Sequence, residues 1–155
     1  GHSAGGHLAA WIAARHKLPA NSPMRMDNPL KLVGVINSGG LADLKASRPV
    51  TARSCLAEIY DQLVGDISST RAEVLSDTSP AEMLPLKVRQ VSFNGHDDSI
   101  APPVLGEGYT RRAKAAGDRA DVVVVLNTGH VELVSPGTEV WDLETATMKD
   151  MLGLD

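Results

Sequence analysis

The chain has 155 residues, the usual size of one domain, and its 43% hydrophobic and 22% charged residues are typical of a globular protein and exclude intrinsic disorder. Fifteen Lys and Arg against nineteen Asp and Glu give a net charge of −4 without a basic block, so nucleic acid and anionic membrane surfaces are not favoured as partners. No apolar run approaches the roughly 20 residues that a membrane-spanning helix needs.

The first part of the sequence predicts a helix followed by a buried strand. Residues 8–15 are rich in alanine, and Leu8 and Ile12 stand four positions apart, which is the spacing of a helix with one buried stripe. After a loop with three prolines, residues 31–36 form a short apolar run that ends in the polar and glycine-containing segment 37–40. This pattern is typical of a strand and its exit loop.

Residues 41–77 are interpreted as an insertion over the sheet. The stretch is mostly polar and contains one amphipathic helix that ends at Gly65. The apolar stripe of that helix consists of Leu56, Ile59, Tyr60 and Leu63.

The second half of the chain alternates strands and helices. Ser79, followed by a proline and then by a glutamate three positions after it, predicts the N-cap of a short helix. Runs 88–93 and 121–126 predict two more strands, and a helix between them begins after Pro102 and ends at Gly117. A last helix carries Val140, Trp141, Met148 and Leu152.

This alternation implies right-handed crossovers and therefore a parallel sheet. A parallel sheet needs both faces covered and its edges protected, so three strands alone would make a poor one. The chain also begins without a methionine, at Gly1 and inside a motif. We therefore expect that an N-terminal part of the domain, with more strands and any targeting segment, is missing from this sequence.

Three short motifs lie at the ends of predicted elements, one directly before a helix and two directly after strands. Residues 1–5 fit the pattern G-x-S-x-G directly before a helix, where two glycines allow the sharp turn that exposes a serine hydroxyl. Segments 94–102 and 128–132 each follow a predicted strand and carry an aspartate and a histidine, respectively. Since the carboxyl ends of parallel strands meet at one edge, we expect a serine nucleophile, its base and an acid to lie together there.

At these residues the chain resembles the α/β-hydrolase superfamily, and within it the small carboxylesterase and kynurenine-formamidase-like group. Segment 1–9 looks like that group's nucleophile elbow, 94–103 like its acid loop and 128–141 like its histidine loop. The resemblance implies an α/β fold, with a parallel sheet flanked by helices and a small helical insertion at about 41–77. It further implies that residues 1–155 are only the C-terminal part of a single hydrolase domain, with about three strands.

Carried over by position, the resemblance assigns the nucleophile to Ser3, the acid to Asp98 and the general base to His130. The backbone N–H of Ala4 would hold the oxyanion, and a second donor would come from a glycine-rich loop that this sequence lacks.

Asp98 is preferred to Asp97 as the acid because it lies three residues after Gly95 and four before Pro102, as in the family's loop. Asn94 departs from the family, where histidine is usual.

The chemistry of such a site needs no metal and no organic cofactor. His2 and His7 flank the serine, but no third ligand has the spacing of a metal site, so we expect no metal. The single cysteine, Cys55, excludes an intrachain disulfide and is typical of a reducing compartment such as the cytoplasm. Leu41 and Tyr60 lie in the insertion, where substrate pockets of such folds form, and are candidates for substrate binding or for packing.

The resemblance implies a serine hydrolase, carboxylesterase-like, that cleaves small carboxylic esters through an acyl-enzyme. The same triad would equally serve an arylformamidase-type amide hydrolase, because both reactions pass through a tetrahedral oxyanion. A third hypothesis is a non-catalytic hydrolase-like fragment that acts as a binding module. The intact order of serine, acid and histidine argues against it.

Overall fold

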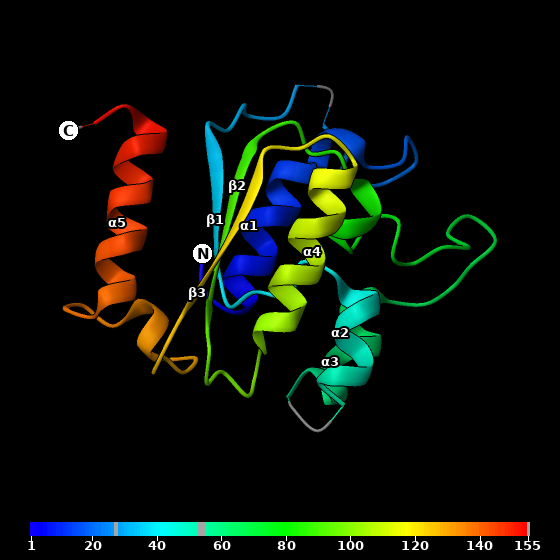
Figure 1. Cartoon of the computed structure of the whole chain (residues 1–155). Helices are drawn as coiled ribbons and strands as arrows, with labels where there is room; N and C mark the ends of the chain where they lie inside the picture. The colour runs from blue at the N-terminus through cyan, green and yellow to red at the C-terminus, as the bar shows by residue number, and fades with distance from the viewer. Residues whose placement is uncertain (27, 53–54, 155) are drawn as a thin grey trace.

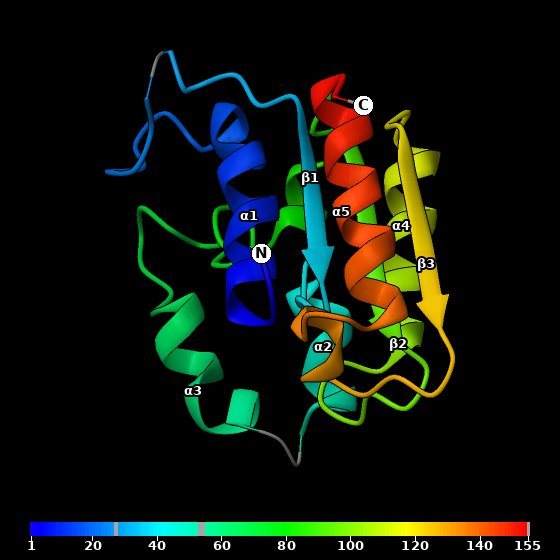
Figure 2. The same ribbon diagram turned by 90° about the vertical axis from the view of Figure 1, so that its left-hand side faces the viewer.

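The structure is a computed structural model that describes residues 1–26, 28–52 and 55–154, with the side chains of residues 55 and 56 outside the description. A sheet lies between two layers of helix, as Figures 1 and 2 show from two directions. None of the helices within these ranges is long and apolar enough to cross a bilayer.

The sheet has three parallel strands in the order β1 (Gly34–Ser38), β2 (Arg89–Gly95) and β3 (Ala120–Val125). All three therefore end at the same edge, at the lower side of Figure 2. The predicted α/β class with a parallel three-stranded sheet is confirmed. β1 starts later than the predicted run 31–36, because its first paired residue lies opposite Arg89, where β2 itself begins.

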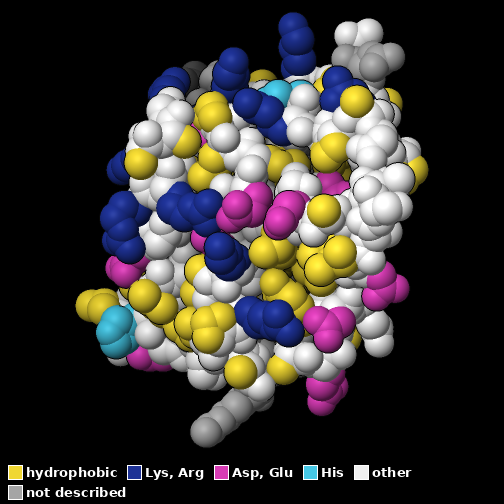
Figure 3. All heavy atoms as spheres, turned by 90° about the vertical axis from the view of Figure 1, so that its right-hand side faces the viewer, with side chains coloured by type: hydrophobic (Ala, Val, Ile, Leu, Met, Phe, Trp, Pro, Cys, Tyr) yellow, Lys and Arg dark blue, Asp and Glu magenta, His cyan; other side chains and the backbone are white. Residues whose placement is uncertain are grey.

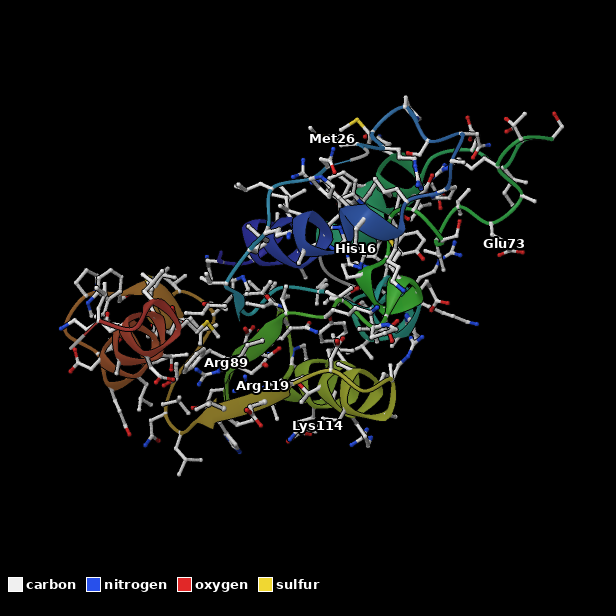
Figure 4. The ribbon with its side chains drawn as sticks, turned by 90° about the horizontal axis from the view of Figure 1, so that it is seen from above. His16, Met26, Glu73, Arg89, Lys114 and Arg119 are labelled. Carbon is white, nitrogen blue, oxygen red and sulfur yellow. The ribbon has the colours of Figure 1, made fainter. Side chains whose placement is uncertain are left out.

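Two helices cover one face of this sheet and one covers the other. Helices α1 (Ala4–Ala14) and α4 (Pro103–Ala115) lie on the same side, whereas α5 (Glu139–Leu152) lies opposite, and the view from above separates the three layers (Figure 4). Arg89, labelled there, lies between the sheet and α5 and forms an ion pair with Asp150. The coverage of both faces fits the burial that a parallel sheet requires.

The inserted segment contains two helices where one was predicted. Helix α3 (Cys55–Val64) matches the predicted amphipathic helix, although the side chain of Leu56 lies outside the described residues. Helix α2 (Leu44–Val50) was missed because Pro49 argues against a helix. Pro49 lies near the end of α2, and Asp43 caps its start by accepting a hydrogen bond from the N–H of Ala46.

The predicted helix after Ser79 is only a short 3₁₀ helix, η2 (Pro80–Met83), with Ser79 at the N-cap position and Pro80 in its first turn as predicted, but the Ser79 side chain makes no capping hydrogen bond to it. Ser79 Oγ instead accepts a hydrogen bond from the backbone N–H of Leu44, at 3.2 Å. The serine thus ties the start of the insertion to its end.

The sheet separates two hydrophobic clusters, and a third one lies in the insertion. Between the sheet and α1 the core is almost wholly aliphatic, with Ala10, Ala14 and Val35 buried together. On the α5 side, Phe93 and Leu133 are among the most buried side chains. Aliphatic side chains build most of this core, in line with the 3% aromatic content.

The first residues of the chain run along the outer edge of β1. The Ser38 N–H donates to the Gly1 carbonyl and the Ser3 N–H donates to the Ser38 carbonyl, both at 2.9 Å. His2 forms a parallel bridge with Ser38. This short pairing fixes where α1 begins, directly after Ser3 and earlier than the predicted 8–15.

Candidate active site

Ser3 lies in a sharp turn between a strand-like segment and a helix. Its φ of 54° and ψ of −122° are unusual for a residue with a side chain, and such strain occurs mainly where function requires it. The turn also depends on glycine, because a Cβ on Gly1 would lie 2.2 Å from the Gly5 carbonyl oxygen. Ser3 thus lies directly before the amino end of α1, at the serine position of the sequence pattern G-x-S-x-G.

Asp98 and His130 meet at the same edge of the sheet. His130 Nδ1 lies 2.7 Å from Asp98 Oδ2, and the Asp98 side chain is fully buried. Its other oxygen, Oδ1, accepts hydrogen bonds from the N–H groups of Ile100 and Ala101, both at 2.8 Å. The carboxylate is therefore held from both sides while it faces the imidazole.

Asp97, the neighbouring aspartate, points elsewhere. Its side chain is 57% exposed and contacts His96 Nδ1 at 2.7 Å. The structure thus brings Asp98, and not Asp97, to His130.

The two loops that carry these residues are joined through their backbones. The Asp97 N–H donates to the Thr128 carbonyl at 3.0 Å and the His96 N–H donates to the Val125 carbonyl at 2.9 Å. Gly95 permits the approach, since a Cβ there would lie 2.2 Å from the Thr128 carbonyl oxygen. Adjacent parallel strands therefore position the acid and the histidine relative to each other.

Two further residues surround the His130 ring. The His2 ring lies 4.6 Å from it between centroids, at an angle of 44°, and His2 Nε2 is 2.9 Å from the His130 carbonyl oxygen. Gly39, at a φ of 61°, comes so close that a Cβ would lie 3.2 Å from the imidazole and 2.8 Å from Leu133. Neither contact could be read from the sequence, because both join residues that are distant along the chain.

A cavity of about 200 Å³ opens beside Ser3. Its wall is mostly apolar and includes Ala4, Leu8, Leu41, Ile59, Leu63 and Ile100. Leu41, one of the two predicted substrate-binding residues, is part of this wall. Tyr60, the other one, is not part of it: its side chain packs with Leu44 and Val64, beneath the guanidinium of Arg48.

Sequence reasoning missed Ile59, Leu63 and Ile100 as cavity residues. Ile59 and Leu63 stand four positions apart on α3, so they share one face of that helix. That spacing was the available signal. Tyr60 belongs to the same apolar stripe but turns toward the insertion's own core.

His7 also lines the cavity, and its Nδ1–H donates to the Leu41 carbonyl at 2.9 Å. Burial lowers the pKa of His7, and the hydrogen bond to Leu41 opposes this only in part. His2 and His7 thus have separate partners. Within the described ranges no group of three His, Cys, Asp or Glu side chains could hold a metal ion.

Charge is balanced on the face of the molecule that Figure 3 displays, where Lys and Arg side chains lie beside Asp and Glu. Arg112 forms ion pairs with both Asp43 and Glu82. A single-sign field that would attract a polyanion is absent from this face.

No protein-family model matches the sequence, and no curated protein shows significant similarity to it. Solved structures do match. A truncated carbohydrate esterase from gut microbiota superposes with a TM-score of 0.65 at 17% identity, covering 97% of this chain and 57% of that one. A thermophilic esterase from Thermogutta terrifontis gives a TM-score of 0.66 at 19% identity, covering 98% and 52%.

An acylaminoacyl peptidase from Pyrococcus horikoshii also matches, with a TM-score of 0.63 at 14% identity, over 98% of this chain and 23% of that one. The chain therefore spans about half the length of the two esterases and less of the peptidase. Identities this low bear on the fold alone. This chain has the α/β-hydrolase fold.

Proposed function

We propose that the chain carries the nucleophile, base and acid of a serine hydrolase that cleaves small carboxylic esters. The observation that carries the proposal is the 2.7 Å contact between buried Asp98 and His130, on the sheet edge where Ser3 occupies a strained turn. A carboxylate, an imidazole and a hydroxyl in this arrangement form a nucleophilic system. The esterases among the structural neighbours share its fold.

In the proposed reaction, Ser3 Oγ attacks the ester carbonyl while His130 Nε2 takes the hydroxyl proton. Asp98 accepts the Nδ1–H bond, which fixes the imidazole tautomer and stabilises the imidazolium. The imidazolium then returns the proton to the alkoxide leaving group as the C–O bond breaks. Water, activated by His130, next attacks the acyl-enzyme and releases the acid and free Ser3.

The oxyanion is assigned to the backbone N–H of Ala4, the first residue of α1. The positive end of an 11-residue helix lies at this point, and it favours a developing negative charge. We further propose that residues 1–155 are the C-terminal part of one hydrolase domain and that the second donor lies outside them. Loss of one such donor lowers kcat roughly 100- to 1000-fold, so the full-length protein is the one to assay.

The decisive experiment combines a fluorophosphonate probe with hydrolysis of p-nitrophenyl acetate. We expect the protein to label and turn over, and Ser3→Ala to abolish labelling and lower kcat by about 10⁶. Ser99→Ala, at an exposed serine of the acid loop, is the matched control and should label normally. Equal labelling of the protein and Ser3→Ala would exclude Ser3 as the nucleophile.

The amidase alternative uses the same triad, so N-formylkynurenine is assayed beside the ester. Turnover of the formamide without turnover of the ester would replace the esterase proposal by the arylformamidase one. Turnover of neither, with no labelling of Ser3, would leave the non-catalytic module as the remaining hypothesis.

A further inference from the structure

The cavity beside Ser3 has the character of a hydrocarbon site. Of its described lining residues, only Ser3 and His7 carry a polar side-chain group, and none carries a charge at neutral pH. His7 Nδ1 is already occupied by the Leu41 carbonyl. A charged substrate group in this cavity would lose water without finding a partner, which is unfavourable.

Four large hydrophobic side chains of this wall are unusually exposed. Leu8 is 51% exposed, Ile59 48%, Ile100 40% and Leu63 38%, and they come from α1, from α3 and from the acid loop. Exposed apolar side chains scattered singly need no explanation, but a group around one concave site indicates an apolar ligand. This arrangement therefore points to a ligand that covers all four.

The position of the cavity decides which half of an ester would occupy it. The leaving group must lie within reach of the base, because His130 returns a proton to it. The described wall includes Ser3 but not His130. The acyl group, which stays bonded to Ser3 Oγ, is the half that fits this side.

Resting on the proposed esterase function, we propose that the cavity binds a short, uncharged aliphatic acyl group and that Ile59 and Leu63 of α3 limit its length. The volume of about 200 Å³ is below the roughly 300–1000 Å³ of sites for drug-sized ligands, so the described wall has room for a short chain. The substrates are thus esters of short fatty acids.

The test uses p-nitrophenyl esters of increasing acyl length, so that the leaving group stays constant. We expect kcat/KM to rise about fourfold for each methylene group that is buried, and then to fall once the cavity is full. A hemisuccinate ester, which resembles the butyrate in length but ends in a carboxylate, should react at least roughly tenfold more slowly than the butyrate.

Leu63→Phe should shift the preferred acyl chain to a shorter one, and Leu63→Ala should shift it to a longer one. Ile67→Phe is the control, since Ile67 lies in the same insertion, is exposed and does not line the cavity. If kcat/KM does not depend on acyl length, or if Leu63→Phe and Ile67→Phe change this dependence alike, the acyl assignment is overturned. The esterase proposal stays intact in that case as long as the protein hydrolyses p-nitrophenyl acetate. Absence of acetate turnover together with unlabelled Ser3 overturns the esterase proposal itself.

A separate observation concerns His2, which connects the serine turn to the histidine loop. Its Nε2–H donates to the His130 carbonyl at 2.9 Å and its ring packs 4.6 Å from the His130 ring. Its backbone is bridged to Ser38 at the end of β1. One side chain thus ties the base to the strand edge that also fixes the nucleophile.

We also propose, on the same esterase function, that His2 is a positioning residue for His130. A displacement of about 1 Å at a reacting group can cost roughly 100-fold in rate, and the loop around His130 has no helix or strand of its own until η3 (Glu132–Val134). His130 is already held by Asp98 and by the backbone bond between the two loops, and His2 adds a hydrogen bond and a ring contact to these restraints.

Three variants separate the two contacts. His2→Gln keeps an N–H donor, His2→Phe keeps a ring, and His2→Ala keeps neither. We expect His2→Ala to lower kcat for p-nitrophenyl acetate about tenfold with KM unchanged, and His2→Gln to recover part of that loss. His16→Ala is the control, at a histidine whose Nδ1 bonds to the Ala13 carbonyl at 3.0 Å within its own stretch of chain.

Thermal unfolding of the same variants distinguishes positioning from folding. A drop in kcat without a matching fall in melting temperature supports the proposal. The positioning proposal is overturned if kcat is unchanged in His2→Ala, or if KM changes instead of kcat. The esterase function is tested separately, by the labelling of Ser3.

Discussion

Two regions meet at the carboxyl edge of the sheet, and they are held by different means. The acid loop follows the central strand β2 and the histidine loop follows its neighbour β3. The two loops are bonded to each other through the Asp97 N–H and the Thr128 carbonyl. The insertion at 41–77 has a small core of its own, Leu44, Tyr60 and Val64. The loops therefore inherit the rigidity of the sheet, whereas the insertion is attached to it at a few points.

Those attachment points are specific. The Leu44 N–H donates to Ser79 Oγ, the Ala81 N–H donates to the Ala42 carbonyl and Arg112 reaches Asp43. The comparison teaches that the proposed reactive groups lie at the carboxyl edge of the sheet, whereas the wall of the proposed acyl site lies partly on the insertion. Changes to the loops should reduce the rate, and changes to the insertion should alter selectivity.

The largest effect in the loop region is expected from Asp98→Asn. An amide keeps the size of the carboxylate but favours the wrong imidazole tautomer, so kcat should fall by about 10⁴. Asp97→Asn, on the exposed neighbour, should change kcat little. The measurement is kcat for p-nitrophenyl acetate hydrolysis. A similar loss of kcat in Asp98→Asn and Asp97→Asn would contradict the assignment of Asp98 as the acid.

A smaller effect is expected from Gly39→Ala. Its φ of 61° makes any side chain unfavourable by about 1–2 kcal/mol, and the added Cβ would press on His130 and Leu133. Gly137→Ala is a matched control, because Gly137 has a φ of 84° with open space around it. Both variants should lose stability in urea unfolding, but only Gly39→Ala should also lose kcat.

Within the insertion, Arg71→Ala tests how weakly this region is coupled to catalysis. The Arg71 guanidinium donates to both carboxylate oxygens of Asp77, at 2.7 and 2.5 Å, and to the Val74 carbonyl. Since the pair is partly exposed, its loss should lower the free energy of unfolding by about 1 kcal/mol. Acetate turnover should stay near normal, and a loss of rate as large as that of Asp98→Asn would break the comparison.

The smallest expected effect is a pH dependence of stability at His7, which joins α1 to Leu41 at the start of the insertion. Burial lowers its pKa in the folded state, so the unfolded chain takes up the proton first as pH falls. Stability should be full above about pH 6.5, the unfolded value, and should decline as the pH falls from there toward the lower folded pKa.

The measurement is urea unfolding at pH 7.5 and pH 5 for the protein and for His7→Gln, in which the contributions of other groups cancel. The variant should lose less stability on acidification. An equal loss in both would show that His7 does not contribute.

How much the sequence predicts differs between the same two regions. The strands around Ile36, Phe93 and Val124 are local apolar runs, and the motifs at their ends follow in chain order, so the sheet and the three proposed site segments could be predicted. A local pattern was enough because parallel strands bring their carboxyl ends together without further information.

The insertion was predicted less well. Helix α2 was missed because Pro49 argues against a helix. Ser79 is the N-cap residue as predicted, but the partner of its hydroxyl could not be foreseen, because that hydrogen bond spans 35 positions. The cavity wall could not be predicted either, since Leu8, Ile59 and Ile100 meet only through tertiary packing. A stripe such as Ile59, Tyr60 and Leu63 gives the buried face of a helix but not which member faces a cavity.

The backbone of Ser3 has a consequence for how such a protein could be engineered. A left-handed φ at a residue with a side chain costs of order 1–3 kcal/mol, whereas glycine adopts it freely. Glycine would therefore be the most stable residue at position 3, but it has no hydroxyl. Directed evolution for heat resistance alone, without a screen for turnover, would therefore favour Ser3→Gly. This substitution would raise stability and remove the proposed nucleophile at the same time.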